Sequence, residues 1–284
     1  MSSISKWVAG ARPRTLPAAI APVLVATTYA ATDWDPLRAL SALLVSLALQ
    51  IGVNYANDYS DGIRGTDDLR VGPVRLTASG LAKPKSVRTA AIISFLFAAL
   101  IGLTLAAATS WWIILVGALA INAAWGYTGG SNPYGYKGLG EISVFLFFGV
   151  VATVGTYYVQ TEELNYQILI ISIPMGALAC AILAINNLRD RAQDETVGKK
   201  TLAVRLGDKG ARRLYIALLV SAHLFALLTF KPAALLTLLA LPLSLSLARG
   251  VSGGATGAAL IPYLAKTGKL QLAFAALFAL GLVI

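Results

Sequence analysis

Two short polar clusters in a mostly apolar chain contain the residues best suited to chemistry. In a helix each residue advances by about 100°. The members of the first cluster from Asn54 to Asp61 therefore share one helix face, and the members of the second cluster, from Asn186 to Asp194, also share one face. Clustered carboxylates on apolar helices are unfavourable unless a cation binds them. Oxygen ligands without His or Cys suit Mg²⁺, which typically joins carboxylates to substrate phosphates, so the aspartates are predicted metal ligands. The members are Asn54, Asn57, Asp58, Asp61 and Asp67 in the first cluster, and Asn186, Asn187, Asp190 and Asp194 in the second.

Basic residues accompany both clusters and are suited to bind phosphate oxygens. They are Arg64, Arg70 and Arg75 after the first cluster, and Arg189, Lys199 and Lys200 within or after the second. Arginine binds phosphate through a planar fork and lysine through a compact charge. One Asp-rich helix end is most often a solvated cap. Two matching ends, each with asparagine and a basic loop, favour a diphosphate site that Mg²⁺ bridges.

The elements that must position these clusters are predicted to be membrane helices. The chain has 284 residues, 57% of them hydrophobic and 13% charged, whereas soluble domains are about 25% charged. Each crossing needs about 20 apolar residues. We therefore expect an all-α, polytopic membrane bundle of about nine transmembrane helices in a single domain, residues 1–284, and this composition excludes a soluble enzyme. The apolar runs lie near 15–32, 37–57, 88–108, 111–128, 140–160, 166–189, 212–230, 232–249 and 270–284.

The stretch 250–264 could be a loop, a re-entrant piece or part of the eighth helix. The first apolar run could also be read as a signal peptide. Pro17 and Pro22 lie inside it and no soluble mature protein follows, so a retained helix is favoured.

The positive charges predict how this bundle is oriented. With the N-terminus inside, 21 of the 23 lysines and arginines fall in inside loops, and only Arg38 and Lys231 fall outside. This asymmetry follows the positive-inside rule. The net charge of +10 is then partly topogenic, so we expect the lipid bilayer and no nucleic acid as a partner. Both clusters follow even-numbered helices, which places them on the cytoplasmic side of the plasma (inner) membrane.

Some chemistry is excluded by residue counts. The chain contains one cysteine, Cys180, and one histidine, His223, both in apolar segments. A Cys/His zinc cluster, a disulfide framework and a Cys–His catalytic pair therefore cannot form.

The two clusters, with their surroundings, resemble the UbiA superfamily of membrane prenyltransferases. Those enzymes carry two Asp-rich motifs, after the second and the sixth of nine helices. The sequence motifs at residues 12–19, 65–73 and 186–207 further resemble those of the branch that prenylates 1,4-dihydroxy-2-naphthoate. The matching stretches are ARPRTLPAAIAPVL (11–24), NDYSDGIRGTDDLRVGPVR (57–75), YTGGSNPYGYKGLGE (127–141) and NNLRDRAQDETVGKKTLAVRLG (186–207).

The resemblance implies a Mg²⁺-dependent transfer of an isoprenyl group from a polyprenyl diphosphate to 1,4-dihydroxy-2-naphthoate, with loss of the carboxylate. It implies catalytic metal–diphosphate roles for Asp61, Asp67, Asp190 and Asp194, with Asp58 as a helper. Substrate-binding roles are expected for Asn54, Asn57, Asn187, Arg64, Arg75, Arg189, Lys199, Lys200, Lys137 and Tyr134.

Several roles stay open at this point. Tyr134, Tyr136 and Lys137 all lie in the loop where the family places residues near its substrates. Arg12 and Arg14 are either topogenic or contact an aromatic carboxylate. Tyr127 and Trp125 either pack or stabilise a cation. A general base is not evident, although Asp190, Asp194 or Glu141 could assist a ring hydroxyl.

Other classes of protein also use carboxylates in membranes. A cation-coupled transporter usually places them near the bilayer midplane, whereas these clusters end helices beside basic loops. A CDP-alcohol phosphotransferase would have its aspartates in one contiguous run. A UbiA-type enzyme with another aromatic acceptor is the nearest alternative.

Overall fold

The computed structural model describes residues 2–67 and 72–284, and within these ranges every regular element is a helix. Seven helical stretches are long and apolar enough to cross a membrane, and two further apolar helices are shorter. The chain is thus a multi-pass membrane protein, while nine crossings stay a prediction. The seven are α3 (Pro36–Ile63), α4 (Pro84–Ala108), α6 to α7 (Gly140–Thr161), α8 (Tyr166–Thr196), α9 (Leu202–Leu227), the stretch Ala234–Ser252 that ends with α10 (Leu241–Ser252), and Gly257–Val283, most of which is α11 (Ile261–Val283); the shorter helices are α2 (Pro17–Tyr29) and α5 (Trp112–Gly126).

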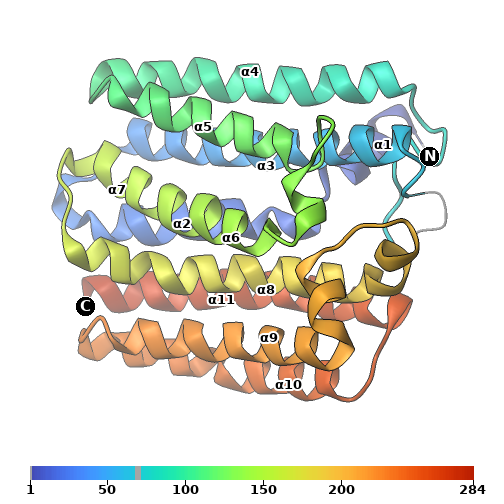
Figure 1. Cartoon of the computed structure of the whole chain (residues 1–284). Coiled ribbons are helices and arrows are strands. Elements are labelled where there is room, and N and C mark those ends of the chain that lie inside the picture. The colour runs from blue at the N-terminus through green and yellow to red at the C-terminus, as the bar shows by residue number, and fades with distance from the viewer. Residues whose placement is uncertain (1, 68–71) are drawn as a thin grey trace.

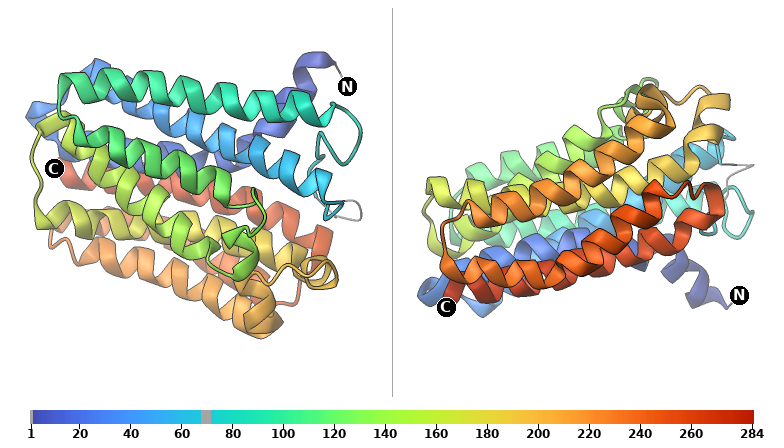
Figure 2. Two further views of the ribbon diagram at one scale, coloured as in Figure 1. Left: turned by 45° about the horizontal axis from the view of Figure 1, so that its top comes forward. Right: turned by 90° about the horizontal axis from the view of Figure 1, so that it is seen from below.

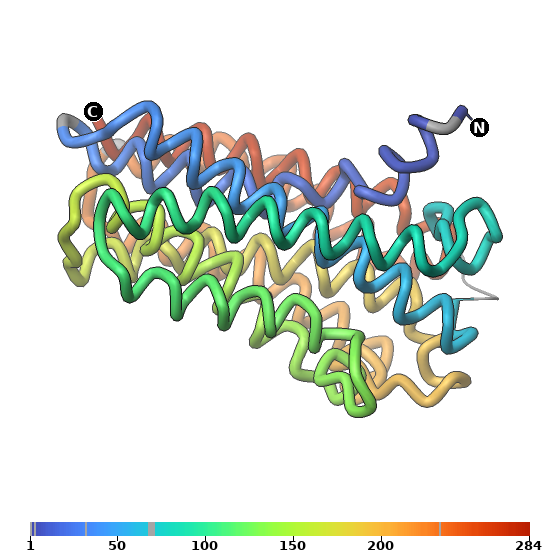
Figure 3. Tube along the Cα trace, turned by 90° about the horizontal axis from the view of Figure 1, so that it is seen from above, coloured from blue at the N-terminus to red at the C-terminus, as the bar shows by residue number. Residues whose placement is uncertain are grey.

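The helices run lengthwise in one bundle (Figure 1). The pair α3 and α4, with α5, lies along one side, α9 and α10 lie along the other, and α8 and α11 lie between them. The loops that follow α3, α8 and α10 gather at the N-terminal end, and the C-terminus lies at the opposite end (Figure 3). Both Asp-containing helix ends therefore meet at one end of the bundle.

Helices α3 and α8 are longer than their apolar runs. α3 begins with Pro36 in its first turn and with the Asp35 carboxylate capping the amides of Leu37 and Arg38, a favourable helix start. It continues to Ile63, and α8 continues to Thr196. The polar residues expected after these helices thus form their last turns, which fixes the predicted one-face geometry.

Two helix starts differ from the sequence-based expectation. α9 begins at Leu202 rather than near 212, with a break at Gly207, whose φ of 67° favours glycine. α11 begins at Ile261 rather than near 270. The polar residues that suggested a loop are packed there: Thr267 Oγ1 lies 2.8 Å from Tyr215 Oη, and Gly268 faces the carbonyl of Arg14. The stretch 250–264 accordingly contains the end of α10, a turn, the 3-10 helix η6 (Gly257–Leu260) and the start of α11.

A helix that the apolar runs did not predict covers the site end. α1 (Ser3–Ala11) lies oblique to the bundle (Figure 2). It is held by a hydrogen bond from Tyr55 Oη to the Trp7 carbonyl (2.8 Å) and one from Lys6 Nζ to the Leu81 carbonyl (3.0 Å).

The span α6 to α7 contains a π-helical segment, η4 (Phe145–Val151), between α6 (Gly140–Val144) and α7 (Ala152–Thr161). Gly149 of this segment packs backbone to backbone on Gly176 of α8, because a Cβ at Gly149 would lie 2.5 Å from the Gly176 Cα. Such close approach between small residues is how helices pack in lipid.

Candidate active site

One large cavity lies inside the bundle and has a volume of about 930 Å³. α3 lines it from Ala42 to Asp61, a length of about 28 Å at 1.5 Å per residue. Side chains of α4, α5 and α7 make most of its wall apolar. At the end where the two Asp-rich helix ends meet, its polar lining residues include Asn57, Asp61, Arg75, Asn186, Asn187, Arg189, Asp190, Asp194 and Lys199.

Both carboxylate oxygens of Asp61 have a partner in the site. Its Oδ2 lies 3.1 Å from Lys199 Nζ, and its Oδ1 accepts a hydrogen bond of 2.6 Å from Tyr136 Oη. The ammonium of Lys199 also lies 4.8 Å from the centre of the Tyr136 ring, a favourable cation–π distance. These contacts join the end of α3 to the segment after α8.

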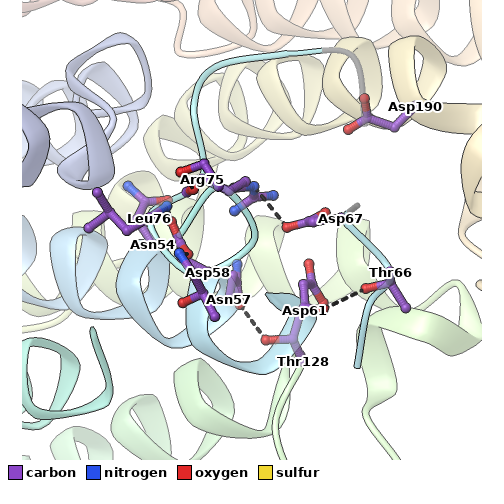
Figure 4. Close-up of polar contacts among 12 residues, drawn as sticks. Asn54, Asn57, Asp58, Asp61, Thr66, Asp67, Arg75, Leu76, Thr128 and Asp190 are labelled. Carbon is purple, nitrogen blue, oxygen red and sulfur yellow. Dashed lines mark hydrogen bonds and ion pairs between the residues drawn. The ribbon is translucent and has the colours of Figure 1, made fainter. Parts of the chain in front are cut away.

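Two further aspartates are paired with arginines. Asp67, buried in the turn after α3, lies 3.0 Å from Nε of Arg75 (Figure 4). Asp190 on α8 accepts two hydrogen bonds from Arg189, of 2.7 and 2.6 Å. Both arginines line the cavity and are buried. The predicted phosphate-binding arginines are therefore the direct neighbours of the predicted metal ligands.

Asp194 lies one turn further along α8, buried and lining the same cavity. Its carbonyl accepts a hydrogen bond of 2.8 Å from the amide of Lys199. This bond turns the chain back after the helix and directs Lys199 into the site.

The asparagines of the two clusters are positioned by neighbouring loops. Asn57 Oδ1 accepts a hydrogen bond of 2.7 Å from Thr128 Oγ1 (Figure 4). Asn187 Nδ2 donates one of 3.0 Å to Glu141 Oε1. Because an ionised carboxylate only accepts, Glu141 fixes the amide of Asn187 and leaves its Oδ1 for the cavity.

Asp58 has a different role from the predicted one. Its two oxygens accept hydrogen bonds from the backbone amides of Leu76 (2.8 Å) and Thr77 (2.9 Å), and it points toward Leu76 in Figure 4. Its oxygens are thus used to hold the segment after the first cluster against α3. Sharing a helix face with Asp61 did not place it at the cavity, so we remove it from the metal ligands.

Three predicted phosphate-binding residues also lie elsewhere. The guanidinium of Arg64 donates to the carbonyls of Thr128 and Gly130 and stacks on Tyr136 at 5.6 Å. The side chains of Lys137 and Lys200 are exposed and do not line the cavity. Arg70, together with Asp68, lies outside the described residues.

Of the three loop residues that the sequence left open, Tyr136 is the one that contacts an aspartate. Tyr134 lines the cavity, but its hydroxyl contacts the Ala123 carbonyl (2.7 Å) and Ser143 (2.8 Å), whereas that of Tyr136 contacts Asp61. Burial, and then the neighbouring Asp61 carboxylate, raise the pKa of the Tyr136 phenol above its ordinary value. Tyr136 therefore stays a hydrogen-bond donor to Asp61 at neutral pH.

The donor chemistry of the site fits a hard cation. Among the described residues, no three His, Cys, Asp or Glu side chains are grouped closely enough to hold a metal ion together. The buried carboxylates of Asp61, Asp67 and Asp190 are each beside a buried lysine or arginine. A magnesium–diphosphate complex contains a cation that carboxylates can bind and an anion that lysine and arginine can bind. When it binds, the carboxylates can therefore bind Mg²⁺ and the basic side chains can bind the diphosphate, in place of one another.

Comparison with known proteins identifies the family. Residues 19–253 match the model of the UbiA prenyltransferase family. The chain is 52% identical to a 1,4-dihydroxy-2-naphthoate octaprenyltransferase from Mycobacterium tuberculosis, over 97% of this chain and 96% of that one. It is 39% identical to the Escherichia coli protein of the same name, over 99% and 96%.

The fold is similar to a UbiA homologue from Archaeoglobus fulgidus solved with DMAPP and Mg²⁺, with a TM-score of 0.72, 16% identity, and coverage of 98% of this chain and 99% of that one. A UbiA homologue from Aeropyrum pernix gives a TM-score of 0.70 at 14% identity, covering 100% and 98%. The structural likeness shows the fold, and the family model and the sequence relatives show the family. This chain belongs to the UbiA prenyltransferase family.

Proposed function

We propose that this protein transfers a polyprenyl group from polyprenyl diphosphate to 1,4-dihydroxy-2-naphthoate, with loss of carbon dioxide and of diphosphate. The convergence of Asp61, Asp190, Asp194 and Lys199 at the polar end of a long apolar cavity is the observation that carries the proposal. The names of the sequence relatives support the acceptor and the polyprenyl donor.

The chain's own residues bind and orient the diphosphate. Asp61, Asp67, Asp190 and Asp194 would hold Mg²⁺, with the Oδ1 of Asn187 beside them. When bound, Mg²⁺ neutralises the charge that develops on the leaving diphosphate. Lys199, Arg75 and Arg189 then bind the phosphate oxygens that remain. Tyr136 keeps Asp61 in place through its hydroxyl.

The reaction is an electrophilic aromatic substitution. The allylic C1–O bond breaks, and its electron pair leaves with the diphosphate. The electron-rich ring attacks C1 and forms the new C–C bond. The carboxylate leaves as carbon dioxide and returns its bonding electrons to the ring. Because carbon dioxide leaves in place of a proton, no net proton is released, and the site needs no general base. The apolar wall excludes water from the allylic cation.

We place the site on the cytoplasmic side of the plasma membrane. The proposal rests on the positive residues of the loops at the site end and on the positive-inside rule.

One assay tests the function. Purified protein receives polyprenyl diphosphate with 1,4-dihydroxy-2-naphthoate or with other aromatic acids, in Mg²⁺ or in EDTA, and the product is identified by mass spectrometry. We expect prenylated, decarboxylated product only from the naphthoate and only with Mg²⁺. Asp61→Ala and Asp190→Ala should each lower turnover at least about 100-fold, as loss of charge stabilisation at a transition state does, while the protein still elutes as a folded species. Turnover with another acid alone would assign a different acceptor, and turnover in EDTA would contradict the magnesium site.

A further inference from the structure

A second group of polar side chains lies deeper in the same cavity, away from the aspartates. Gln50 and Asn54 lie on α3, about three and two turns before Asp61, and both line the cavity together with Thr15. At 1.5 Å per residue they lie about 16 and 10 Å from Asp61 along the helix. This spacing leaves room for a diphosphate between the aspartates and the pair.

The orientation of both side-chain amides follows from hydrogen counting. Thr15 Oγ1 donates its only hydrogen to the Arg12 carbonyl (3.0 Å). It can then only accept, and it accepts from Gln50 Nε2 (3.1 Å) and from Asn54 Nδ2 (3.1 Å). Asn54 Nδ2 also donates to the Ala11 carbonyl (2.9 Å). The protein therefore uses both hydrogens of Asn54 Nδ2 and one of the two on Gln50 Nε2.

The two amide oxygens are left over. Within the part of the chain that the structure describes, Gln50 Oε1 and Asn54 Oδ1 accept no hydrogen bond from a protein group, although the residues are only 7% and 3% exposed. Neither oxygen is among the atoms that are fully buried without a partner, so both keep a surface that faces the cavity, where a ligand that carries donors can reach them. Arg12, which also lines the cavity and donates to the Asn54 carbonyl at 3.3 Å, adds a positive charge beside them.

We propose that Gln50 Oε1 and Asn54 Oδ1 accept hydrogen bonds from the ring hydroxyls of the aromatic acceptor, with Thr15 as the positioning residue and Arg12 as the partner of the carboxylate. The two residues are one helical turn, about 6 Å, apart, which suits two hydroxyls on opposite sides of one six-membered ring. The inference rests on the proposed function and adds the residues that select the acceptor. It also predicts selection for the reduced ring, because a quinone offers only acceptors at these positions.

The test compares a ligand with hydroxyls and one without them. The proposed substrate 1,4-dihydroxy-2-naphthoate is compared with 2-naphthoate, which has the same rings and carboxylate and which we expect to compete with it. In Gln50→Leu and Thr15→Val we expect kcat/KM for the substrate to fall about tenfold, the effect of one hydrogen bond. The inhibition constant of 2-naphthoate and the KM for polyprenyl diphosphate should change less than twofold. Thr15→Ser keeps the hydroxyl and should restore most of the loss.

Ser46→Ala is the matched control. Ser46 lines the cavity one turn before Gln50, but its hydroxyl donates to the Ala19 carbonyl (2.9 Å), so its loss should leave the ratio of substrate to inhibitor affinity unchanged. A parallel loss for substrate and 2-naphthoate in Gln50→Leu and Thr15→Val would mean a collapsed cavity and overturn the inference, as would kcat/KM within twofold of the parent. If the parent chain itself does not use the dihydroxy acid, the proposed function fails along with it.

Discussion

At the scale of single residues, the site contains buried ion pairs whose charges complement those of the proposed metal–diphosphate substrate. Asp61 with Lys199 and Asp190 with Arg189 are buried and within 3.1 Å. A buried charge is tolerated only with a partner, so these pairs keep the cavity end stable before any ligand arrives. Binding of a metal–diphosphate complex then exchanges partners rather than creating new buried charges.

Tyr136→Phe isolates one of these contacts. The substitution removes the hydrogen bond to Asp61 and keeps the ring on which Lys199 and Arg64 stack. We expect kcat/KM for polyprenyl diphosphate to fall about 10- to 150-fold, because a hydrogen bond to a charged group contributes about 1.5–3 kcal/mol. Measurement is by steady-state kinetics at saturating acceptor.

The pH profile provides the control for Tyr136→Phe. The raised pKa of Tyr136 means that its neutral, donating form persists well above the ordinary pKa of tyrosine, 10.0. The ratio of parent to variant activity should therefore stay constant from pH 7 to about 9.5. A ratio that falls to one near pH 9 would show that the hydroxyl ionises there and does not act as we infer.

Sequence periodicity predicted which helix faces carry the site, but not the partner of each side chain. Asp58 shares the face of Asp61, yet amides 18 and 19 residues further along the chain bind its oxygens. Tyr136 and Lys137 are neighbours in a loop, and the 3-10 turn with Gly138 at φ 76° decides which of them reaches Asp61. Such choices depend on tertiary contacts that no local pattern encodes.

At the scale of elements, α3 and α8 position the aspartates of the site. A prediction from hydropathy places the ends of these helices where polar residues begin, near 57 and 189, because hydropathy measures only the preference of a residue for lipid. The helices continue because their polar turns bind the loops that follow them, through Asp58 in α3 and Asp194 in α8, which offsets the poor helix propensity of Asn and Asp. The starts, by contrast, lie within one residue of the predicted apolar runs, and the side chains of Asp35 and Asn165 cap them.

Asp58→Asn distinguishes a structural carboxylate from a metal ligand. Asparagine can satisfy one of the two amides at Leu76 and Thr77 and leaves the other without an acceptor. We expect the detergent-solubilised protein to unfold several degrees lower, measured by a thermal-shift assay. The Mg²⁺ concentration that gives half-maximal activity should stay within twofold of the parent value.

Asp61→Asn is the contrasting variant. It should shift the Mg²⁺ requirement at least about tenfold in the activity that remains. If Asp58→Asn shifted the Mg²⁺ requirement as strongly as Asp61→Asn, Asp58 would belong to the metal site after all.

At the scale of the whole molecule, the two termini lie at opposite ends of the bundle, which requires an odd number of crossings (Figure 3). Seven helices meet the length and hydropathy expected of a membrane span, and α2 and α5 run alongside them. The loops rich in lysine and arginine share the end that holds Asp61 and Asp190. This common end follows from the alternation of apolar runs and was therefore predictable, unlike the contacts made within it.

Cysteine labelling in intact bacterial cells tests this orientation. Lys137 is exposed in the loop that contacts Asp61, and Glu163 is exposed in the turn that follows α7, at the other end of the bundle. We expect a membrane-impermeant maleimide to label Glu163→Cys in intact cells, but Lys137→Cys only after permeabilisation. The parent chain is the control and should not be labelled, because its one cysteine, Cys180, is buried and its thiol donates a hydrogen bond to the Glu141 carbonyl. Labelling of Lys137→Cys in intact cells would place the diphosphate site outside and contradict the cytoplasmic assignment.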